Sequence, residues 1–247
     1  MSLPDAQQWL WPQWQPHPRV RAVVTTRVGD YSPPPWAGFN LGANCGDDGA
    51  RVERARQHVQ QALQADHPPH WLVQVHGTRI VEAGGPEQEA DGVWTSDSGR
   101  PCAVLTADCL PVLLARCDGT AVAAVHAGWR GLHAGILEAA GARLAADGQP
   151  LSAWIGPTIS QPAYQVGDEV RDAFISKDPQ AAEAFIADAA PGHWRMSLVH
   201  IASQRLSDAG VADVQGGHLC TASDTGHFYS YRKEGRTGRF ASLVWLV

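Results

Sequence analysis

The chain has 247 residues and a formal net charge of −6 at pH 7, a length that can bury a full core. No linker-like tract divides it, so we expect one domain over residues 1–247. Its basic residues are dispersed, which argues against a nucleic-acid or anionic membrane partner, and its N-terminus resembles neither a secretory leader nor a membrane span. Five cysteines at irregular spacing indicate free thiols in a reducing compartment. We therefore expect a cytoplasmic protein that acts on small molecules.

The first predicted elements are a strand over residues 20–27 and an exposed helix over 47–65, joined by a long loop rich in proline and glycine. Arg27 stands at the mouth of this loop and Asn40 near its end. Arg27 is a candidate for holding an anion and Asn40 for hydrogen bonding a substrate. The simpler alternatives, a surface ion pair and a turn-forming asparagine, remain open.

Residues 70–83 alternate apolar and polar side chains up to His76-Gly77 and then resume the alternation. This pattern predicts a strand, a break and a second strand. His76 is therefore expected at a strand end.

The central stretch of the chain is a predicted hairpin with Asp118-Gly119 at its two-residue turn. The flanking apolar runs, 110–117 and 120–126, pair antiparallel if the numbers of paired residues sum to 237. Cys109 then lies opposite Gly128, and His126 lies opposite position 111. The hairpin thus predicts a thiol and an imidazole at one end of the sheet.

A helix is predicted directly after this hairpin, with its body at 132–146. The unpaired N–H groups at its start favour an anion, and Arg130 lies at the same point.

The last third of the chain is predicted to alternate helices and strands. Ala-rich residues 168–190 carry Phe174, Phe185 and Ile186 at helical intervals, and 197–209 repeat the pattern after a serine cap. A strand is expected to end at Cys220, and two further strands flank a basic turn within 228–247.

Two histidines and one cysteine stand out as a possible metal site. His76 and His126 are each followed by a small residue, and Cys109 follows an aspartate in a predicted turn. Catalytic zinc takes three protein ligands and keeps a fourth position open, which would place the three donor atoms roughly 3.3–3.8 Å apart. Spacing alone leaves a second reading open, in which Cys109 is a nucleophile and His126 its base. The two roles exclude each other while a metal is bound.

Six motifs, together with TTR…NLG over 25–42, resemble the YfiH-type laccase-domain family: QVHG at 74–77, ADG at 90–92, TADCLPVLL at 106–114, HAGWRG at 126–131, IGP at 155–157 and YRKEGRTGR at 231–239. The resemblance implies an α+β fold with mixed β-sheets layered between helices, related to a superfamily of putative cysteine hydrolases. It also implies a metal site of His76, Cys109 and His126.

The resemblance further implies a purine nucleoside phosphorylase that also deaminates adenosine and cleaves methylthioadenosine, with polyphenol oxidase activity as an older description. Multicopper oxidases need several His-x-His pairs, and the sequence has none. We therefore expect zinc, with copper as the alternative metal. Arg130 is a candidate for binding phosphate and Asp108 for moving protons, although Asp108 can equally brace the turn.

Two alternatives to this zinc enzyme remain: a cysteine hydrolase acting on a cell-wall precursor or peptide-like substrate, and a metal-dependent regulatory binding protein. The expected partners are a purine nucleoside and phosphate. A monomer is compatible with the sequence, which does not fix the oligomeric state.

Overall fold

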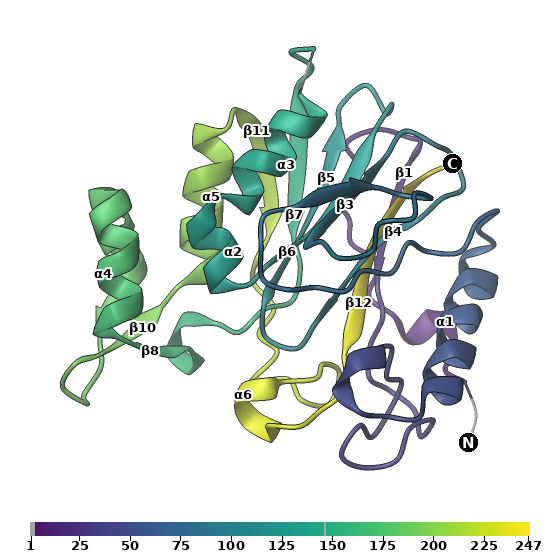
Figure 1. Ribbon diagram of the computed structural model, residues 1–247, viewed down its shortest axis with the longest axis horizontal. Coiled ribbons are helices and arrows are strands. Elements are labelled where there is room, and N and C mark those ends of the chain that lie inside the picture. Colours follow the sequence, from purple (N-terminus) through teal and green to yellow (C-terminus); the bar gives the residue numbers. More distant parts are fainter. Residues whose placement is uncertain (1–2, 146) are drawn as a thin grey trace.

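The computed structural model describes residues 3–145 and 147–247, which form three β-sheets (Figure 1). The six-stranded sheet is mixed and has the order β11 (Val211–Gly216), β7 (Leu151–Ile155), β5 (Leu110–Arg116), β6 (Val122–Ala127), β3 (Gly92–Thr95) and β2 (Ile80–Glu82). A three-stranded antiparallel sheet consists of β1 (Val20–Val24), β12 (Phe240–Leu246) and β4 (Cys102–Thr106). A small outer sheet consists of β8 (Gln165–Gly167), β10 (His193–Met196) and β9 (Phe185–Ala187).

The two larger sheets pack face to face between helices, so that the described chain forms four layers. The bounds of the helices are α1 (Gly49–Leu63), α2 (Trp129–Ala134), α3 (Ile136–Leu144), α4 (Asp168–Lys177), α5 (Leu198–Asp208) and α6 (Tyr231–Glu234). Helices α3 and α5 cover the outer face of the six-stranded sheet, while α1 covers the outer face of the three-stranded sheet (Figure 1). The α+β fold with mixed sheets between helices is therefore confirmed.

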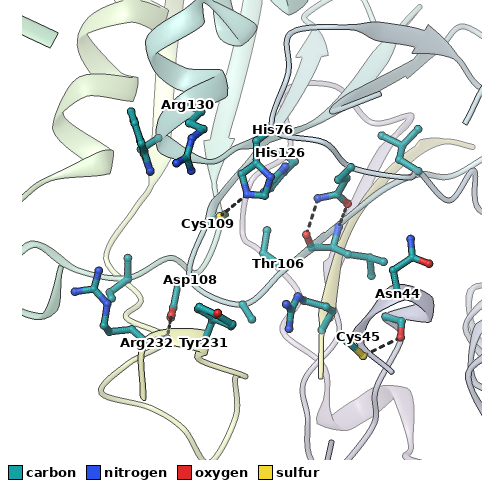
Figure 2. A pocket seen from close by; sticks show the side chains of 18 of the residues that line it. Asn44, Cys45, His76, Thr106, Asp108, Cys109, His126, Arg130, Tyr231 and Arg232 are labelled. Atoms are coloured by element: carbon teal, nitrogen blue, oxygen red, sulfur yellow. Dashed lines mark hydrogen bonds between the residues drawn. The ribbon is translucent and has the colours of Figure 1, made fainter. Parts of the chain in front are cut away.

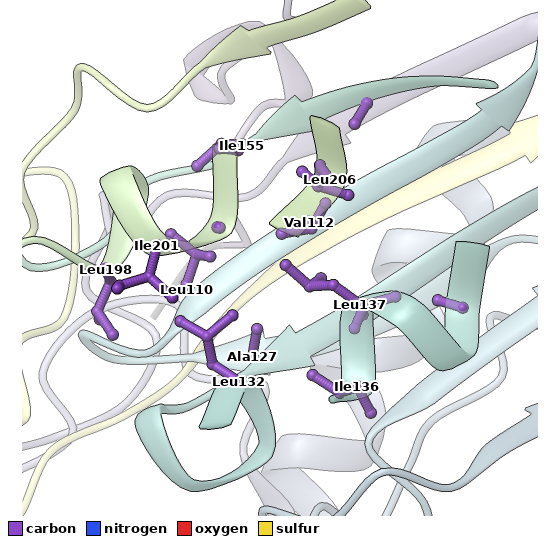
Figure 3. Packing of buried hydrophobic residues seen from close by; sticks show 14 of the residues in the cluster. Leu110, Val112, Ala127, Leu132, Ile136, Leu137, Ile155, Leu198, Ile201 and Leu206 are labelled. Carbon is purple, nitrogen blue, oxygen red and sulfur yellow. The ribbon is translucent and has the colours of Figure 1, made fainter. Parts of the chain in front are cut away.

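Alternation along the strands separates the layers. On β5, Val112 and Leu114 face α3 and α5, while Leu113 and Ala115 face the other sheet. Figure 3 shows the first of these cores, where side chains of α2, α3 and α5 meet those of β5. Each fully buried leucine in it contributes roughly 1.5–3 kcal/mol to folding, which makes this sheet a rigid support for the residues at its ends.

The predicted hairpin register is confirmed, because Leu110 pairs with Ala127 and Pro111 with His126. The turn differs from the prediction: Arg116 and Ala121 close a four-residue loop, and of Asp118 and Gly119 only Gly119 has a positive φ, at 68°. The aspartate instead accepts hydrogen bonds from Thr120, which removes the need for a second left-handed residue.

Two predicted elements in the first half of the chain are shorter or less exposed than expected. Residues 70–76 form only isolated bridges, so His76 lies in a turn before β2 and not at a strand end. Helix α1 is capped by Asp48, and Ala55, Val59 and Leu63 bury one of its faces against the three-stranded sheet, so it is less exposed than predicted.

Tertiary packing also changes the second half. Gly135, at φ 107°, divides the predicted helix 132–146 into α2 and α3, and residue 146 lies outside the described residues. Phe185 and Ile186 lie in β9 and not in a helix, while Ser197 caps α5 as predicted.

Near the C-terminus, β11 ends at Gly216, before Cys220. The first of the two predicted terminal strands is replaced by a loop and α6. Within the described residues, no helix combines the length and apolar character that crossing a membrane requires.

Candidate active site

The three predicted metal ligands lie together at one end of the six-stranded sheet (Figure 2). His126 lies on β6, Cys109 immediately precedes β5, and His76 lies in the turn before β2. One ligand atom from each lies within 4.8 Å of the other two, and Cys109 Sγ is 3.8 Å from His76 Nε2. The two imidazole rings cross at 78° with their centroids 4.8 Å apart. Folding therefore converges the trio on one point.

Asp91 holds the two histidines of the trio in place. Its fully buried carboxylate accepts a hydrogen bond from His126 Nδ1–H at 2.7 Å, and it accepts hydrogen bonds from the backbone N–H groups of Val75, His76 and Gly77 at 3.2, 2.9 and 2.6 Å. These bonds hold the His76 backbone in its left-handed conformation, at φ 62°. Because a carboxylate only accepts, His126 donates from Nδ1 and keeps Nε2 as its ligand atom.

Gly128 provides the space that the trio needs. A Cβ atom at this position would lie 2.6 Å from His76 Cδ2 and 3.2 Å from Cys109 Sγ. Any larger residue would push apart two of the three ligands. The first three residues of the HAGWRG motif therefore supply one ligand, His126, and the residue that leaves space for the other two, Gly128.

Cys109 and His126 are electrostatically coupled. Burial opposes ionisation of the Cys109 thiol, but the charge on His126 and hydrogen bonds with His126 and His76 outweigh it and lower the pKa of the thiol to about 6. Burial likewise opposes protonation of His126, whereas the Cys109 thiolate and Asp91 raise the pKa of this imidazole. The site thus favours a thiolate at neutral pH.

The trio fits a transition metal such as zinc. A thiolate and two imidazoles are zinc's preferred donors, and Asp91 supplies the carboxylate contact that orients zinc-bound histidines. His76 is exposed and Cys109 half-buried, so one side of the trio faces solvent and leaves room for a further ligand. Among the described residues, this is the one cluster of three or more potential metal ligands.

A cavity of about 510 Å³ opens beside the trio. Its apolar and aromatic lining includes Leu105, Trp129, Tyr164 and Tyr231, and four arginines add positive charge: Arg56, Arg130, Arg232 and Arg239. This volume and this mixture of apolar walls with a few polar groups are typical of small-molecule sites.

Asp108 lines the cavity but is fully engaged with the protein. Its Oδ1 accepts from Thr221 Oγ1 at 2.6 Å, and its Oδ2 accepts from the Arg232 backbone N–H at 2.6 Å. Its φ of 94° bends the chain directly before Cys109. These contacts match the bracing alternative for Asp108, whereas its proposed role in proton transfer stays a prediction.

The structure does not bring Arg27 and Asn40 into the cavity. Arg27 forms an ion pair with Glu234 at 2.7 Å and stacks on Tyr229. Asn40 is fully buried, and its Oδ1 accepts the backbone N–H groups of Gly42 and Arg239 at 2.9 and 2.8 Å. Both side chains hold loops together, and their predicted roles in substrate binding have no geometric support.

Arg130 lies where the sequence predicts, at the start of α2 beside the trio (Figure 2). Its guanidinium stacks on Trp129 at 4.5 Å, and no carboxylate of the described residues pairs with it. It therefore remains available to an anionic ligand.

Several residues of the site were not predicted from the sequence, among them Asp91, Arg56 and Arg239. Asp91 stands within the ADG motif and Arg239 ends the YRKEGRTGR motif, but these motifs alone assign neither residue a role. Arg56 lies in α1, where alternating charges suggest only a solvated face.

Comparison with known proteins assigns this chain to a family. The family model described as multi-copper polyphenol oxidoreductase laccase matches residues 21–247. A purine nucleoside phosphorylase of Pseudomonas aeruginosa is 48% identical over 239 residues, 96% of this chain and 98% of the relative.

The chain belongs to this laccase-like family. A purine nucleoside phosphorylase of Escherichia coli, named YfiH, is 42% identical and covers 96% of this chain and 98% of its own length. Crystal structures of a Neisseria meningitidis protein and of YfiH from Bacillus licheniformis superpose with TM-scores of 0.89 and 0.86, at 39% and 29% identity. The first pair covers 97% and 99% of the two chains, and the second 92% and 93%.

Proposed function

We propose that this chain is a zinc-dependent purine nucleoside phosphorylase with a single catalytic centre at His76, Cys109 and His126. The observation that carries the proposal is the convergence of these ligands in the wall of a cavity that also presents Arg130. The names of the Pseudomonas and Escherichia relatives support the substrate class. When bound, zinc supplies Lewis acidity, which stabilises negative charge on an attacking or leaving group.

In phosphorolysis, an oxygen of phosphate forms a bond to C1′ of the ribose. The C1′–N9 bond breaks, and its electron pair leaves with the purine, which then takes up a proton. Arg130 holds the phosphate charge beside the trio, and Tyr231 and Tyr164 offer flat faces to the base. The same cavity can accommodate methylthioadenosine. Adenosine deamination is a different step: the oxygen of a water forms a bond to C6 of the purine, the bond from C6 to the amino nitrogen breaks, and the amino group leaves as ammonia.

All residues of this proposal come from one chain, so a monomer suffices. They are spread over the sequence from 76 to 231, which fits one working domain over residues 1–247. The free thiols at the site favour a reducing compartment, and we place the protein in the cytoplasm.

The test is product identification from adenosine and inosine, with and without phosphate, using protein of measured metal content. Phosphorolysis yields free base and ribose 1-phosphate only when phosphate is present, whereas deamination yields inosine and ammonia without it. Cys109→Ala prepared in parallel controls for a contaminating host phosphorylase. Release of base by that variant, or none by the zinc-loaded protein, would refute the proposal.

The laccase name suggests copper oxidase chemistry, which the ligand set does not fit. Four-electron reduction of O₂ needs several coppers, and the described residues contain one three-ligand cluster. A zinc-loaded, copper-free sample should therefore turn over adenosine and oxidise no phenol. Phenol oxidation by such a sample would reverse this assignment.

A cysteine hydrolase is the second candidate, because the pKa of Cys109 is lowered to about 6 beside His126. In this mechanism the thiolate attacks a carbonyl, and His126 protonates the leaving group. Metal removal separates the two functions: a chelator should abolish nucleoside cleavage, whereas it should free Cys109 for acyl transfer.

A further inference from the structure

The four arginines of the cavity form two groups with different surroundings. Arg130 and Arg232 are exposed, and both lie close enough to Tyr164 to influence its ionisation. Arg56 and Arg239 are half-buried and lie toward Gly42 and Cys45, which line the same cavity. Within the described residues, none of the four forms an ion pair.

Arg56 reaches the cavity from α1. Its Nε donates to the Leu41 carbonyl at 3.0 Å, and its guanidinium stacks on Trp71 at 4.6 Å. Burial lowers the pKa of this arginine, which shows that its charge is poorly solvated. The acidic residue one turn earlier, Glu53, is exposed. Its charge acts against the effect of burial on the pKa of Arg56, but it forms no ion pair with this arginine.

Arg239 is fixed from the opposite side, immediately before β12. Its Nη1 donates to the carbonyls of Thr237 and Gly238 at 2.9 and 2.8 Å, and Asn40 holds its backbone. A Cβ atom on Gly42 would lie 2.8 Å from Arg239 Cγ. The absence of a side chain at position 42 therefore leaves the space that the Arg239 side chain occupies.

Backbone carbonyls orient these two guanidinium groups without neutralising them. A half-buried cation without a counter-ion is costly, and an anionic ligand offsets that cost. Guanidinium groups match the oxygens of a phosphoryl group, to which each can donate two hydrogen bonds. Asn44, which lines the same part of the cavity with no hydrogen bond in the described residues, adds a neutral donor and acceptor (Figure 2).

We propose that Arg56 and Arg239 form a second anion subsite that binds the phosphoryl group of a nucleoside 5′-monophosphate. The subsite is distinct from the position beside the trio where Arg130 holds free phosphate. A cavity of about 510 Å³ falls in the range of sites for ligands of this size. The nucleoside part of the ligand rests on the proposed function, whereas the anion subsite does not.

Calorimetric titration in phosphate-free buffer tests this subsite, with adenosine, adenosine 5′-monophosphate and inorganic phosphate as separate probes. The wild-type protein should bind the monophosphate at least about tenfold more tightly than adenosine. Arg56→Gln and Arg239→Gln should each remove most of this preference and leave the affinity for adenosine within about twofold of wild type. Arg130→Gln should retain the preference.

Arg236→Gln is the matched control. Arg236 lies in the same C-terminal segment as Arg239, is exposed and stacks on Trp36. It does not line the cavity. It should bind all three probes as the wild type does. Thermal melts identify a variant that has unfolded, in which case Arg56→Lys and Arg239→Lys, which keep the charge and lose the planar fork, replace it.

Three outcomes overturn the proposal. In the first, the wild-type protein binds the monophosphate no more tightly than adenosine. In the second, both arginine variants still prefer the monophosphate to adenosine, as expected if the phosphoryl group binds at the trio. In the third, both variants lose affinity for inorganic phosphate by the same factor as for the monophosphate. The last outcome would assign the pair to free phosphate. Base release is assayed separately in the presence of phosphate, so failure of the phosphorylase proposal is recognised independently of these affinities.

Discussion

The two ends of the cavity handle charge in opposite ways. At the trio, the buried carboxylate of Asp91 balances His126, and the Cys109 thiolate adds a second negative group. At the other end, Arg56 and Arg239 donate hydrogen bonds to backbone carbonyls, and neither forms an ion pair with a carboxylate of the described residues. The trio end is therefore prepared for a cation and the arginine end for an anion.

This difference also concerns rigidity. Cys109 and His126 are anchored at the ends of strands β5 and β6, whose apolar side chains are buried against α3 and α5. The arginine end is assembled from α1, the loop around Gly42 and the segment before β12. Asn40 joins the last two by accepting backbone N–H groups of Gly42 and Arg239, and Arg56 joins α1 to the loop through the Leu41 carbonyl. We expect substitutions at the trio to affect chemistry and metal binding, and those at the arginine end to affect ligand choice.

The largest effect is expected for Cys109→Ala, which should reduce nucleoside turnover to background and weaken zinc binding. The fold should persist, because the neighbouring strands have their own core. Steady-state kinetics, metal analysis and a thermal melt check this. Cys117→Ala, at the turn end of the same hairpin, should behave as wild type, and full activity in a folded Cys109→Ala protein would exclude both mechanisms that use this thiol.

Asp91→Asn should weaken zinc binding by about 10–100-fold, because the amide cannot accept from His126 Nδ1 and from three backbone N–H groups at once. Chelator competition measures this affinity independently of activity. Asp97→Asn, an exposed carboxylate paired with Arg100, is the control. Unchanged metal affinity in a folded Asp91→Asn protein would show that the carboxylate does not orient the ligands.

In metal-free protein, alkylation of Cys109 by iodoacetamide should fall about tenfold between pH 7 and pH 5, since a pKa of about 6 makes the thiolate dominant above it and the thiol below it. Cys102, whose pKa burial raises, should stay unmodified throughout. Mass spectrometry of the two peptides gives both rates. A Cys109 rate that keeps rising steeply above pH 8 would contradict the coupling with His126.

Arg130→Ala should raise the KM for phosphate about tenfold, as expected for loss of one charge-assisted contact at an exposed site, with little change in nucleoside binding. Arg143→Ala is a close control, because Arg143 also stacks on a tryptophan, Trp94 at 4.1 Å, but lies outside the cavity. If the dependence on phosphate is the same in both variants, the phosphate site lies elsewhere.

The smallest effect is expected for Gly42→Ala, which should weaken binding of adenosine 5′-monophosphate a few-fold because the added methyl group displaces Arg239. Adenosine binding should not change. Gly49→Ala, where a Cβ would meet nothing within 4 Å, serves as the control. Equal affinities in the two variants would mean that the position of Arg239 does not matter to the ligand.

The sequence by itself determined the parts of this protein that depend on local pattern. The hairpin register followed from a short turn and two apolar runs, and with it the pairing that brings Cys109 close to His126. The serine cap at Ser197 likewise marked the start of α5. Local chemistry decides such features, because each depends on residues close together in the chain.

Only the tertiary structure decided which distant side chains share the cavity. Arg27 and Asn40 had suitable chemistry but serve to hold loops, whereas Arg56, on a helix that resembled a solvated face, enters the cavity wall. Asp91 is 35 residues from His126 and reaches it because β3 and β6 pair in the sheet. Contacts of this kind depend on how sheets and helices pack, and periodicity along the chain carries no information about them.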